Sequence, residues 1–456
     1  IPRIVSHDVY LNAIVVSVVL VVLALVLIRR ALRDEVTFAL AVVLLVCCNG
    51  FMDFTTAGLE NPLAYLVIAF YLLQYARLFR GEKAEQPVLL PRLALAFGLA
   101  LVTRHDLLLL LLPSFVQALL VHRSGLRGRG WVSLALLALG PLAAWSSFAL
   151  VYYGSLFPNP ALAKLNTGIA HADLIRQGAR YLVASLRFDT VAVVVLAAAV
   201  VAAFATRERW MRGLALGVLA NVAYVVWVGG DFMLGRFLSF AYLVAVVMLL
   251  SCMDIRRTRG APALAGAVLL AYAFVYPHTP VNSGRRYSNT TQHAGIADER
   301  GVYFTATSIH AYVEHTRTRT TPYFPDHASA KRGYEIGRGP YKLTDSNMIG
   351  FFGYWCGTRV MIADRLGLAD PLFARLPVAD RQRWRIGHFF RAPVPGYYES
   401  IVHDDAEIHD PQLNDYYRKI RLVTQGPIFS KERWGAIVAM NLGRGDRYDA
   451  AYEARR

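Results

Sequence analysis

Residues 9–28 read VYLNAIVVSVVLVVLALVLI and decide the class of the protein, because this long run is apolar and contains no charged residue. A helix needs about 20 apolar residues to cross the ~30 Å hydrocarbon core of a bilayer. The run is followed at once by Arg29 and Arg30, and then by Arg33. Basic residues at this place are typical of a helix that leaves the membrane on the cytoplasmic side. We therefore expect residues 9–28 to form a transmembrane helix.

Further apolar segments recur along the first part of the chain. Hydrophobic residues make up 55% of the sequence and the mean hydropathy is +0.38, which is far too apolar for an ordinary soluble protein. The sequence predicts a polytopic α-helical membrane protein with about ten membrane segments, located in a bacterial cytoplasmic (inner) membrane. After residues 9–28 these segments are 36–51, 62–78, 93–102, 107–121, 131–151, 191–205, 214–228, 237–252 and 262–276.

The formal net charge of +16 is concentrated in every second connection between these segments. A basic balance can indicate nucleic-acid binding, but this alternation is what the positive-inside rule describes, so we exclude nucleic acid as a partner. We expect the five basic connections to face the cytoplasm. They carry Arg29, Arg30 and Arg33; Arg80, Lys83 and Arg92; Arg123, Arg127 and Arg129; Arg207, Arg209 and Arg212; and Arg256, Arg257 and Arg259.

The other connections must then face outwards, and almost all the unusual polar residues near the membrane lie in them. Charged residues beside a bilayer are usually kept for a task, so we expect them to converge on one extracytoplasmic site. The alternative is a set of unrelated loop residues. The residues concerned are Asp53 and Glu60; Arg104, His105 and Asp106; Asn159 and Lys164; and Asp231 and Arg236.

The hydropathy drops after residue 278, and short alternating apolar stretches such as 359–363 and 436–440 indicate strands. We therefore predict a transmembrane domain over residues 1–278 and an extracytoplasmic α/β soluble domain over residues 279–456. The chain begins with Ile and lacks a charged region before its first apolar run, so we expect an N-terminal part upstream. The four cysteines show neither a disulfide framework nor a metal-ligand spacing, and we predict no metal site.

The outward residues suggest two kinds of chemistry. A phosphate held at the membrane surface needs fixed cations, for which Arg offers a bidentate fork, and Arg236, Lys164 and Arg104 are the candidates. The alternative for each is a side chain that snorkels to the headgroups. Acid–base work on a hydroxyl needs a carboxylate, and Asp53, Glu60 and Asp231 are candidates for it. No P-loop, HExxH, GxSxG or CxxC pattern occurs, which argues against the common hydrolase and protease classes.

Several of these motifs, in this order, resemble the outer loops of GT-C membrane glycosyltransferases, most closely the mycobacterial terminal β-(1→2)-arabinofuranosyltransferases and their Gram-negative relatives. In the membrane part they are TAGLENP (56–62), TRHD (103–106), YYG (152–154) with PN (158–159) and AK (163–164), and GGDFM (229–233) with GRF (235–237). In the C-terminal part they are DER (298–300), the glycines at 350 and 353, IADRLGLADP (362–371) and RIGH (385–388).

The resemblance implies an inverting transfer of a sugar, arabinofuranose favoured, from a polyprenyl-phosphate donor to a cell-envelope glycan acceptor. Membrane lipid would be a further partner, and a divalent cation is compatible with the family. The family's catalytic aspartates lie in a first outer loop that would precede residue 9, so the general base is expected upstream. His105 stands where the family pattern has Pro. Implied roles are donor-phosphate binding for Arg236, Lys164 and Arg104; catalysis for Asp53, Glu60 and Asp231; and acceptor binding for Asn61, Asn159 and His388.

Two other functions fit the same pattern. One is a transporter for a lipid-linked sugar, with the outward charges lining its pathway, although the paired halves typical of transporters are not visible in the sequence. The other is a non-catalytic envelope or flagellar-motor-control protein on the same scaffold, because a fold does not by itself fix a function.

Overall fold

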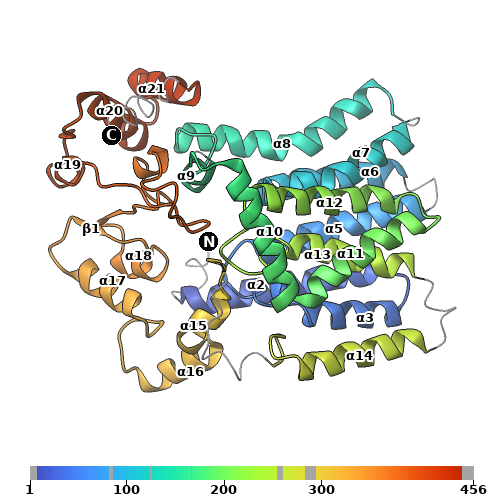
Figure 1. The fold of residues 1–456 in the computed structure, drawn as a ribbon. Coiled ribbons are helices and arrows are strands. Elements are labelled where there is room, and N and C mark those ends of the chain that lie inside the picture. The colour runs from blue at the N-terminus through green and yellow to red at the C-terminus, as the bar shows by residue number, and fades with distance from the viewer. Residues whose placement is uncertain are drawn as a thin grey trace. The chain divides into compact units, whose positions relative to one another are not determined.

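A computed structural model describes residues 8–81, 86–123, 126–165, 167–253, 260–282 and 294–443 (Figure 1). Lys83, Arg256, Arg257 and Arg259, which the sequence analysis assigned to basic connections, lie outside these residues. The chain is mainly helical and divides into two compact units. Unit 1 comprises residues 1–144 and 171–301, and unit 2 comprises residues 145–170 and 302–456. The predicted boundary at residue 278 differs from this division, and the assignment of the parts to membrane and water stays a prediction.

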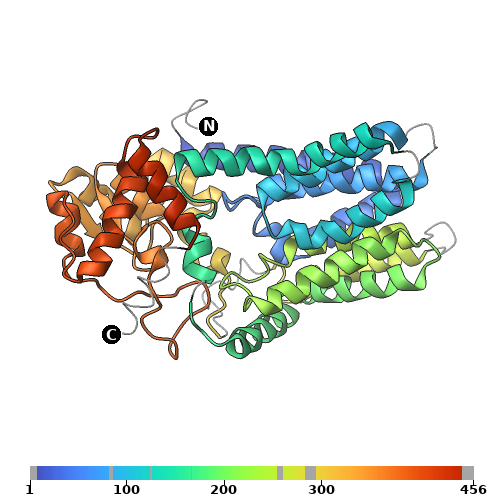
Figure 2. The same cartoon turned by 90° about the horizontal axis from the view of Figure 1, so that it is seen from above.

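Unit 1 is a bundle of helices that lie side by side (Figure 2). Aspartates open the first two, since the side chain of Asp8 accepts a hydrogen bond from Leu11 N and that of Asp34 accepts one from Thr37 N. The helices are α2 (Val9–Ala31), α3 (Glu35–Val46), α4 (Asn49–Met52), α5 (Asn61–Arg80), α6 (Gln86–Thr103), α7 (Leu107–His122), the first part of α8 (Gly128–Tyr152), α10 (His171–Phe188), α11 (Thr190–Ala205), α12 (Met211–Trp227), α13 (Ser239–Cys252) and α14 (Ala261–Val275).

Three helices among the described residues, α2, α5 and α8, are long and apolar enough to cross a membrane. The count rises to four if α10 and α11, which are bent by 107° at a short break, form one span. Helices α3, α7, α12, α13 and most of α6 and α14 are apolar but shorter. This agrees with a helical membrane protein, whereas the number of passes stays a prediction. Helix α10 was not expected, because it lies between the predicted apolar segments 131–151 and 191–205 and is largely polar.

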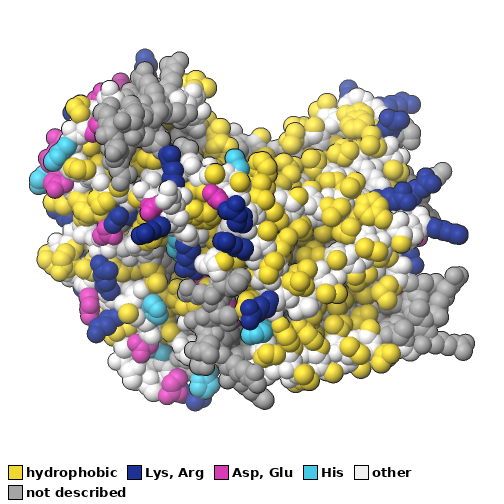
Figure 3. Space-filling model, in the orientation of Figure 1, with side chains coloured by type: hydrophobic (Ala, Val, Ile, Leu, Met, Phe, Trp, Pro, Cys, Tyr) yellow, Lys and Arg dark blue, Asp and Glu magenta, His cyan; other side chains and the backbone are white. Residues whose placement is uncertain are grey.

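The surface of unit 1 exposes many apolar side chains. Helix α2 exposes Val15, Val18, Val19 and Val22, while α5 and α13 are buried inside the bundle. Apolar side chains cover the helices on the face seen in Figure 3, and Lys and Arg side chains gather at one end of them. A contiguous apolar surface of this kind is rare on a soluble monomer and is typical of contact with lipid.

The connections of unit 1 fall into two groups at opposite ends of the bundle. At one end Arg33 pairs with Glu208 at 3.7 Å, and Arg80 donates to the carbonyl of Ala31. At that same end the Gln117 side chain donates to the carbonyl of Arg209. These contacts bring the basic connections α2–α3 and α11–α12 together with the ends of α2, α5 and α7. The connections between them, which carry the acidic residues, meet at the other end.

Unit 2 contains a small sheet surrounded by short helices. Strands β1 (Leu343–Asp345) and β2 (Met361–Ala363) pair in parallel, with Thr344 opposite Ile362. The strand expected at 359–363 is therefore present in part, but residues 436–440 lie in a helix. The helices are α9 (Asn159–Leu165), α15 (Glu299–Thr307), which begins in unit 1, α16 (Ile309–Thr318), α17 (Ala328–Arg338), α18 (Phe351–Cys356), η4 (Phe373–Arg375), α19 (Tyr397–His403), α20 (Pro411–Gln425) and α21 (Lys431–Asn441).

Candidate functional site

Glu60, the residue before α5, links three connections at the acidic end of unit 1. Its Oε1 atom accepts a hydrogen bond from Nη1 of Arg104, which follows α6, and a second from Nη2 of Arg236, at 3.0 Å. Arg236 lies between α12 and α13. One carboxylate oxygen is thus held between two guanidinium groups from separate connections. We call Glu60, Arg104, Asp106, Asp231 and Arg236 the Glu60 cluster.

Arg104 is held in place by more than Glu60. Its Nε and Nη2 atoms donate to the two oxygens of Asp106 at 2.9 and 2.7 Å, which is a bidentate pair. The guanidinium also lies over the ring of Phe240, 4.7 Å from its centroid. The Arg104 side chain is only 12% exposed. Its position is therefore fixed by a carboxylate on one side and an aromatic ring on another.

Asp231 is the most deeply buried acid of the Glu60 cluster, with 2% of its surface exposed. Its Oδ1 atom accepts from the backbone N–H of Phe232, and its Oδ2 atom lies 3.6 Å from Nη1 of Arg236. Neither Oδ2 of Asp231 nor Nε of Arg236 has a hydrogen-bond partner among the described residues. A buried donor and a buried acceptor left unsatisfied are costly unless water or a ligand meets them.

The side chains of the Glu60 cluster favour one another's ionised forms. Burial alone raises the pKa of Glu60, but the guanidinium groups of Arg236 and Arg104 outweigh it, and the pKa falls below its ordinary value. Burial likewise lowers the pKa of Arg104, and Asp106 and Glu60 more than reverse that effect. Three carboxylates (−3) and two guanidinium groups (+2) leave a formal charge of −1. Both guanidinium groups thus already have carboxylate partners.

Two glycines bring the connections together. Gly235 has a φ of +75°, and a Cβ atom there would lie 2.6 Å from Cα of Gly50. A Cβ atom on Gly50 would in turn lie 2.7 Å from the carbonyl oxygen of Gly235. The backbones meet where only glycine fits, one residue before Arg236. The Gly-rich bend at 229–235 is thus what delivers Arg236 to Glu60.

Asp53 forms a second charged group at the same end of unit 1. It pairs at 2.9 Å with Arg300, from the DER motif at 298–300, and Asp298 belongs to the same motif. Burial and the neighbouring charge of Asp298 raise the pKa of Asp53 to about 7, although Arg300 pulls it down. Burial also raises the pKa of Asp298. This pairing could not be predicted, because the two residues come from distant parts of the chain.

Asn61 and Asp189 lie beside these groups. Asn61 is fully buried; its Nδ2 donates to Ser239 Oγ at 3.3 Å, and its Oδ1 has no partner among the described residues. Asp189, at the break between α10 and α11, accepts from the backbone N–H of Gly50 at 2.8 Å. Sequence reasoning missed Asp189 because α10 was not recognised. Its carboxylate secures the turn on which Gly50 meets Gly235.

The other predicted site residues, Asn159, Lys164 and His388, belong to unit 2. Asn159 opens α9 and accepts from Arg375 Nη1 at 3.4 Å, and Lys164 lies half-buried in the last turn of that helix. His388 lies in a tight turn, with its Nδ1 atom 3.3 Å from the carbonyl of Ile386. Their roles stay predictions.

The acids of the motif at 362–371 stabilise a loop. Asp364 accepts hydrogen bonds from the backbone N–H groups of Leu366, Leu368 and Ala369. Asp370 accepts from two backbone N–H groups and from the hydroxyl of Tyr397. Both aspartates are fully buried. Buried carboxylates satisfied in this way are structural.

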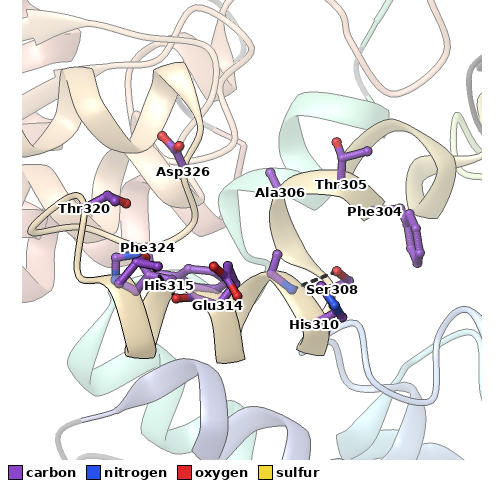
Figure 4. A pocket seen from close by; sticks show the side chains of 12 residues that line it. Phe304, Thr305, Ala306, Ser308, His310, Glu314, His315, Thr320, Phe324 and Asp326 are labelled. Carbon is purple, nitrogen blue, oxygen red and sulfur yellow. Dashed lines mark hydrogen bonds between the residues drawn. The ribbon is translucent and has the colours of Figure 1, made fainter.

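A pocket of about 540 Å³ lies in unit 2, between α15, α16 and the segment before α17. Glu314 and His315 from α16 line it together with Asp326 (Figure 4). No predicted site residue contributes to its lining. Across the described part of the chain, no group of three or more His, Cys, Asp or Glu side chains is placed to hold a metal ion.

Comparisons of the chain with protein-family models, with curated proteins and with solved structures find no match. The glycosyltransferase resemblance therefore rests on the sequence motifs.

Proposed function

We propose that the protein is a polyprenyl-phosphate-dependent, inverting glycosyltransferase of the bacterial cytoplasmic membrane. It would transfer a sugar, arabinofuranose favoured, to a cell-envelope glycan on the extracytoplasmic face. In this proposal the shorter apolar helices cross the membrane together with α2, α5 and α8, giving the roughly ten passes expected from the sequence. The acidic end of unit 1 then faces outwards, and unit 2 is the extracytoplasmic domain.

The observation that carries the proposal is the oxygen site between Arg104 and Arg236. Glu60 Oε1 occupies it, and a phosphate oxygen has the same charge and the same hydrogen-bonding needs. Glu60 is the more exposed partner, with 32% of its side chain exposed against 12% for Arg104 and 15% for Arg236. The donor phosphate would replace Glu60 there, and Asp106 and Asp231 would keep the two guanidinium groups in place.

Asp53 supports the same reaction as a proton acceptor. The acceptor hydroxyl oxygen would bond to the anomeric carbon as the bond from that carbon to the phosphate oxygen breaks. The hydroxyl proton would pass to a base, and the polyprenyl phosphate would leave with the electron pair. A carboxylate with a pKa of about 7 can both take and release a proton near neutral pH. We assign this role to Asp53.

The test is transfer of label from decaprenyl-phosphoryl arabinose to a short arabinan by the purified protein. Arg236→Ala is expected to lose at least 100-fold in transfer, and Arg236→Lys to recover little, because Lys offers no fork. Arg33→Ala, which removes an exposed pair at the opposite end of unit 1, is the matched control and should transfer normally. Transfer by Arg236→Ala at the normal rate would show the phosphate assignment to be wrong.

A second candidate function follows from the same contacts. Both guanidinium groups of the Glu60 cluster already have carboxylate partners, so the cluster can serve simply to tie three connections together. This favours a non-catalytic envelope protein on the same scaffold. A measurement of decaprenyl phosphate binding distinguishes this candidate from the glycosyltransferase, because a purely structural cluster is not expected to bind the lipid.

A further inference from the structure

The last turn of α8 and the hairpin of α20 and α21 form one piece within unit 2. Arg433, in the first turn of α21, is 1% exposed, and its guanidinium group donates to four backbone carbonyls of the described residues. Its Nη1 reaches Val151 O at 2.9 Å and Ile428 O at 3.1 Å, and its Nη2 reaches Tyr152 O at 3.0 Å. It therefore satisfies carbonyls at the C-terminal end of α8, which have no partner within the helix.

Two further contacts hold the hairpin against α8. The Asn441 side chain, at the end of α21, donates to the carbonyl of Gly154 and accepts from the backbone N–H of Leu156. Gly154 has a φ of +70°, and a Cβ atom there would lie 2.3 Å from Val423 of α20. The hairpin thus cannot shift along α8 without breaking charged hydrogen bonds and close packing.

This fixes the position of the turn at 426–430. The carbonyl oxygens of Ile428 and Val151 accept from the same nitrogen, so they are no more than about 6 Å apart. The turn therefore lies beside the last turn of α8. At its tip Phe429 is 84% exposed, and Ile428 is exposed as well. Such large apolar side chains on a water-facing turn lose the benefit of burial.

The neighbouring surface of α8 is aromatic. Trp145, Phe148 and Tyr152 lie along one exposed face of the helix. The ring centroids of Trp145 and Phe148 are 5.6 Å apart, and those of Phe148 and Tyr152 are 5.4 Å apart. Tyr153 continues the row. Trp and Tyr are enriched where a membrane helix passes into the headgroup region. Since α8 is one of the three helices able to span a membrane, this row marks where it would leave the hydrocarbon.

We infer that the tip of the α20–α21 hairpin, Ile428 and Phe429, inserts into the lipid–water interface beside the end of α8. The partner is the bilayer surface itself. The inference rests on the proposed membrane placement of α8, but it does not depend on catalysis. Its consequence is that the C-terminal hairpin holds unit 2 against the membrane.

The experiment uses the full chain in vesicles of phosphatidylglycerol and phosphatidylethanolamine. An NBD fluorophore is attached to single introduced cysteines in a Cys252→Ser background, because the other three native cysteines are buried. The sites are Phe429→Cys, Asp415→Cys on the exposed surface of α20, and Leu139→Cys on the exposed apolar face of α8. A shallow nitroxide lipid and aqueous iodide serve as quenchers.

We expect NBD at position 429 to emit at shorter wavelength than at 415 and to be quenched several-fold more by the lipid nitroxide. Position 415 should respond to iodide, and position 139 to lipid quenchers only. If 139 is in lipid but 429 responds like 415, the hairpin inference is wrong while the membrane placement stands. If 139 itself is quenched by iodide, α8 does not span the membrane and both proposals fail.

Discussion

Replacing Glu60 by Gln tests whether Glu60 holds the place of a phosphate. The change keeps the size of the side chain and its oxygen acceptor but removes the charge that lies between Arg104 and Arg236. The formal charge of the Glu60 cluster then rises from −1 to zero. Asp106 still holds Arg104 with its bidentate pair, so the Arg104 guanidinium group keeps its position in the anion site.

The size of the effect follows from the geometry. Two like charges about 4 Å apart repel by about 4 kcal/mol at an effective dielectric constant of 20. Glu60 is about one-third exposed and can turn towards water as the phosphate enters, which reduces the repulsion. We therefore take about a third of this repulsion energy. Removal of the charge should therefore tighten binding of decaprenyl phosphate by about 1.4 kcal/mol, which is roughly tenfold.

Stability should move in the opposite direction. Glu60→Gln weakens two charge-assisted hydrogen bonds in a half-buried setting, which we expect to destabilise the protein by about 1–2 kcal/mol. Binding is measured by calorimetry in lipid nanodiscs, and stability by thermal unfolding of the same samples. Glu35→Gln is the matched control: it weakens the exposed pair with Arg29 and should change neither quantity measurably.

The binding and stability results for Glu60→Gln must be interpreted together. Tighter lipid-phosphate binding with lower stability supports a site from which Glu60 is displaced. Lower stability with unchanged or weaker binding would refute the displacement argument and would leave the Glu60 cluster as a structural tie between three connections.

Three further predictions concern single contacts. Asp53 has a raised pKa in the folded protein, so its contribution to stability is present below about pH 4 and is lost as the pH rises through about 7. This loss amounts to no more than about 4 kcal/mol. Asp53→Asn should abolish it, as measured by unfolding curves between about pH 4 and 8. Arg433→Ala leaves buried carbonyls unsatisfied and should destabilise by about 1–3 kcal/mol for each carbonyl that water cannot reach, whereas Arg418→Ala at an exposed pair should not. Gly154→Ala should destabilise by more than about 1 kcal/mol, while Gly140→Ala, with open space around its Cβ, should not. A melting temperature for Gly154→Ala at or above that for Gly140→Ala would contradict the close packing on Val423.

Hydropathy was a good guide to the helices that are apolar on all sides. The apolar segments at 62–78, 191–205 and 237–252 agree with α5, α11 and α13 to within three residues at each end. It failed for α10, which buries one side only and carries Arg and Asp on the other. It also failed at 436–440, where an alternating apolar stretch is part of α21, because five residues cannot distinguish a strand from one turn of an amphipathic helix.

Part of the candidate site could be placed from the sequence, but its pairings could not. Alternation of basic connections is enough to assign Glu60, Arg104 and Arg236 to one end of the helices. Which acid meets which base depends on lateral packing, and Glu60 and Arg236 are 176 residues apart in the chain. Charge patterning along the sequence suggested Arg236, Lys164 and Arg104 as cations ready for a phosphate. In the structure Arg104 and Arg236 are already paired with carboxylates.

The close approach of Gly50 and Gly235 explains why these pairings form at all, and it separates assembly of the site from its chemistry. Any side chain at Gly235 must push the bend away from Gly50, and Arg236 moves with it. Gly235→Ala keeps every charged residue and yet should uncouple Arg236 from Glu60. In a double-mutant cycle, the coupling energy between Glu60 and Arg236 should then disappear, while that between Glu60 and Arg104 should persist. Equal loss of both would mean that the three connections move as one body, and the Glu60 cluster would then be organised by the helices rather than by this glycine contact.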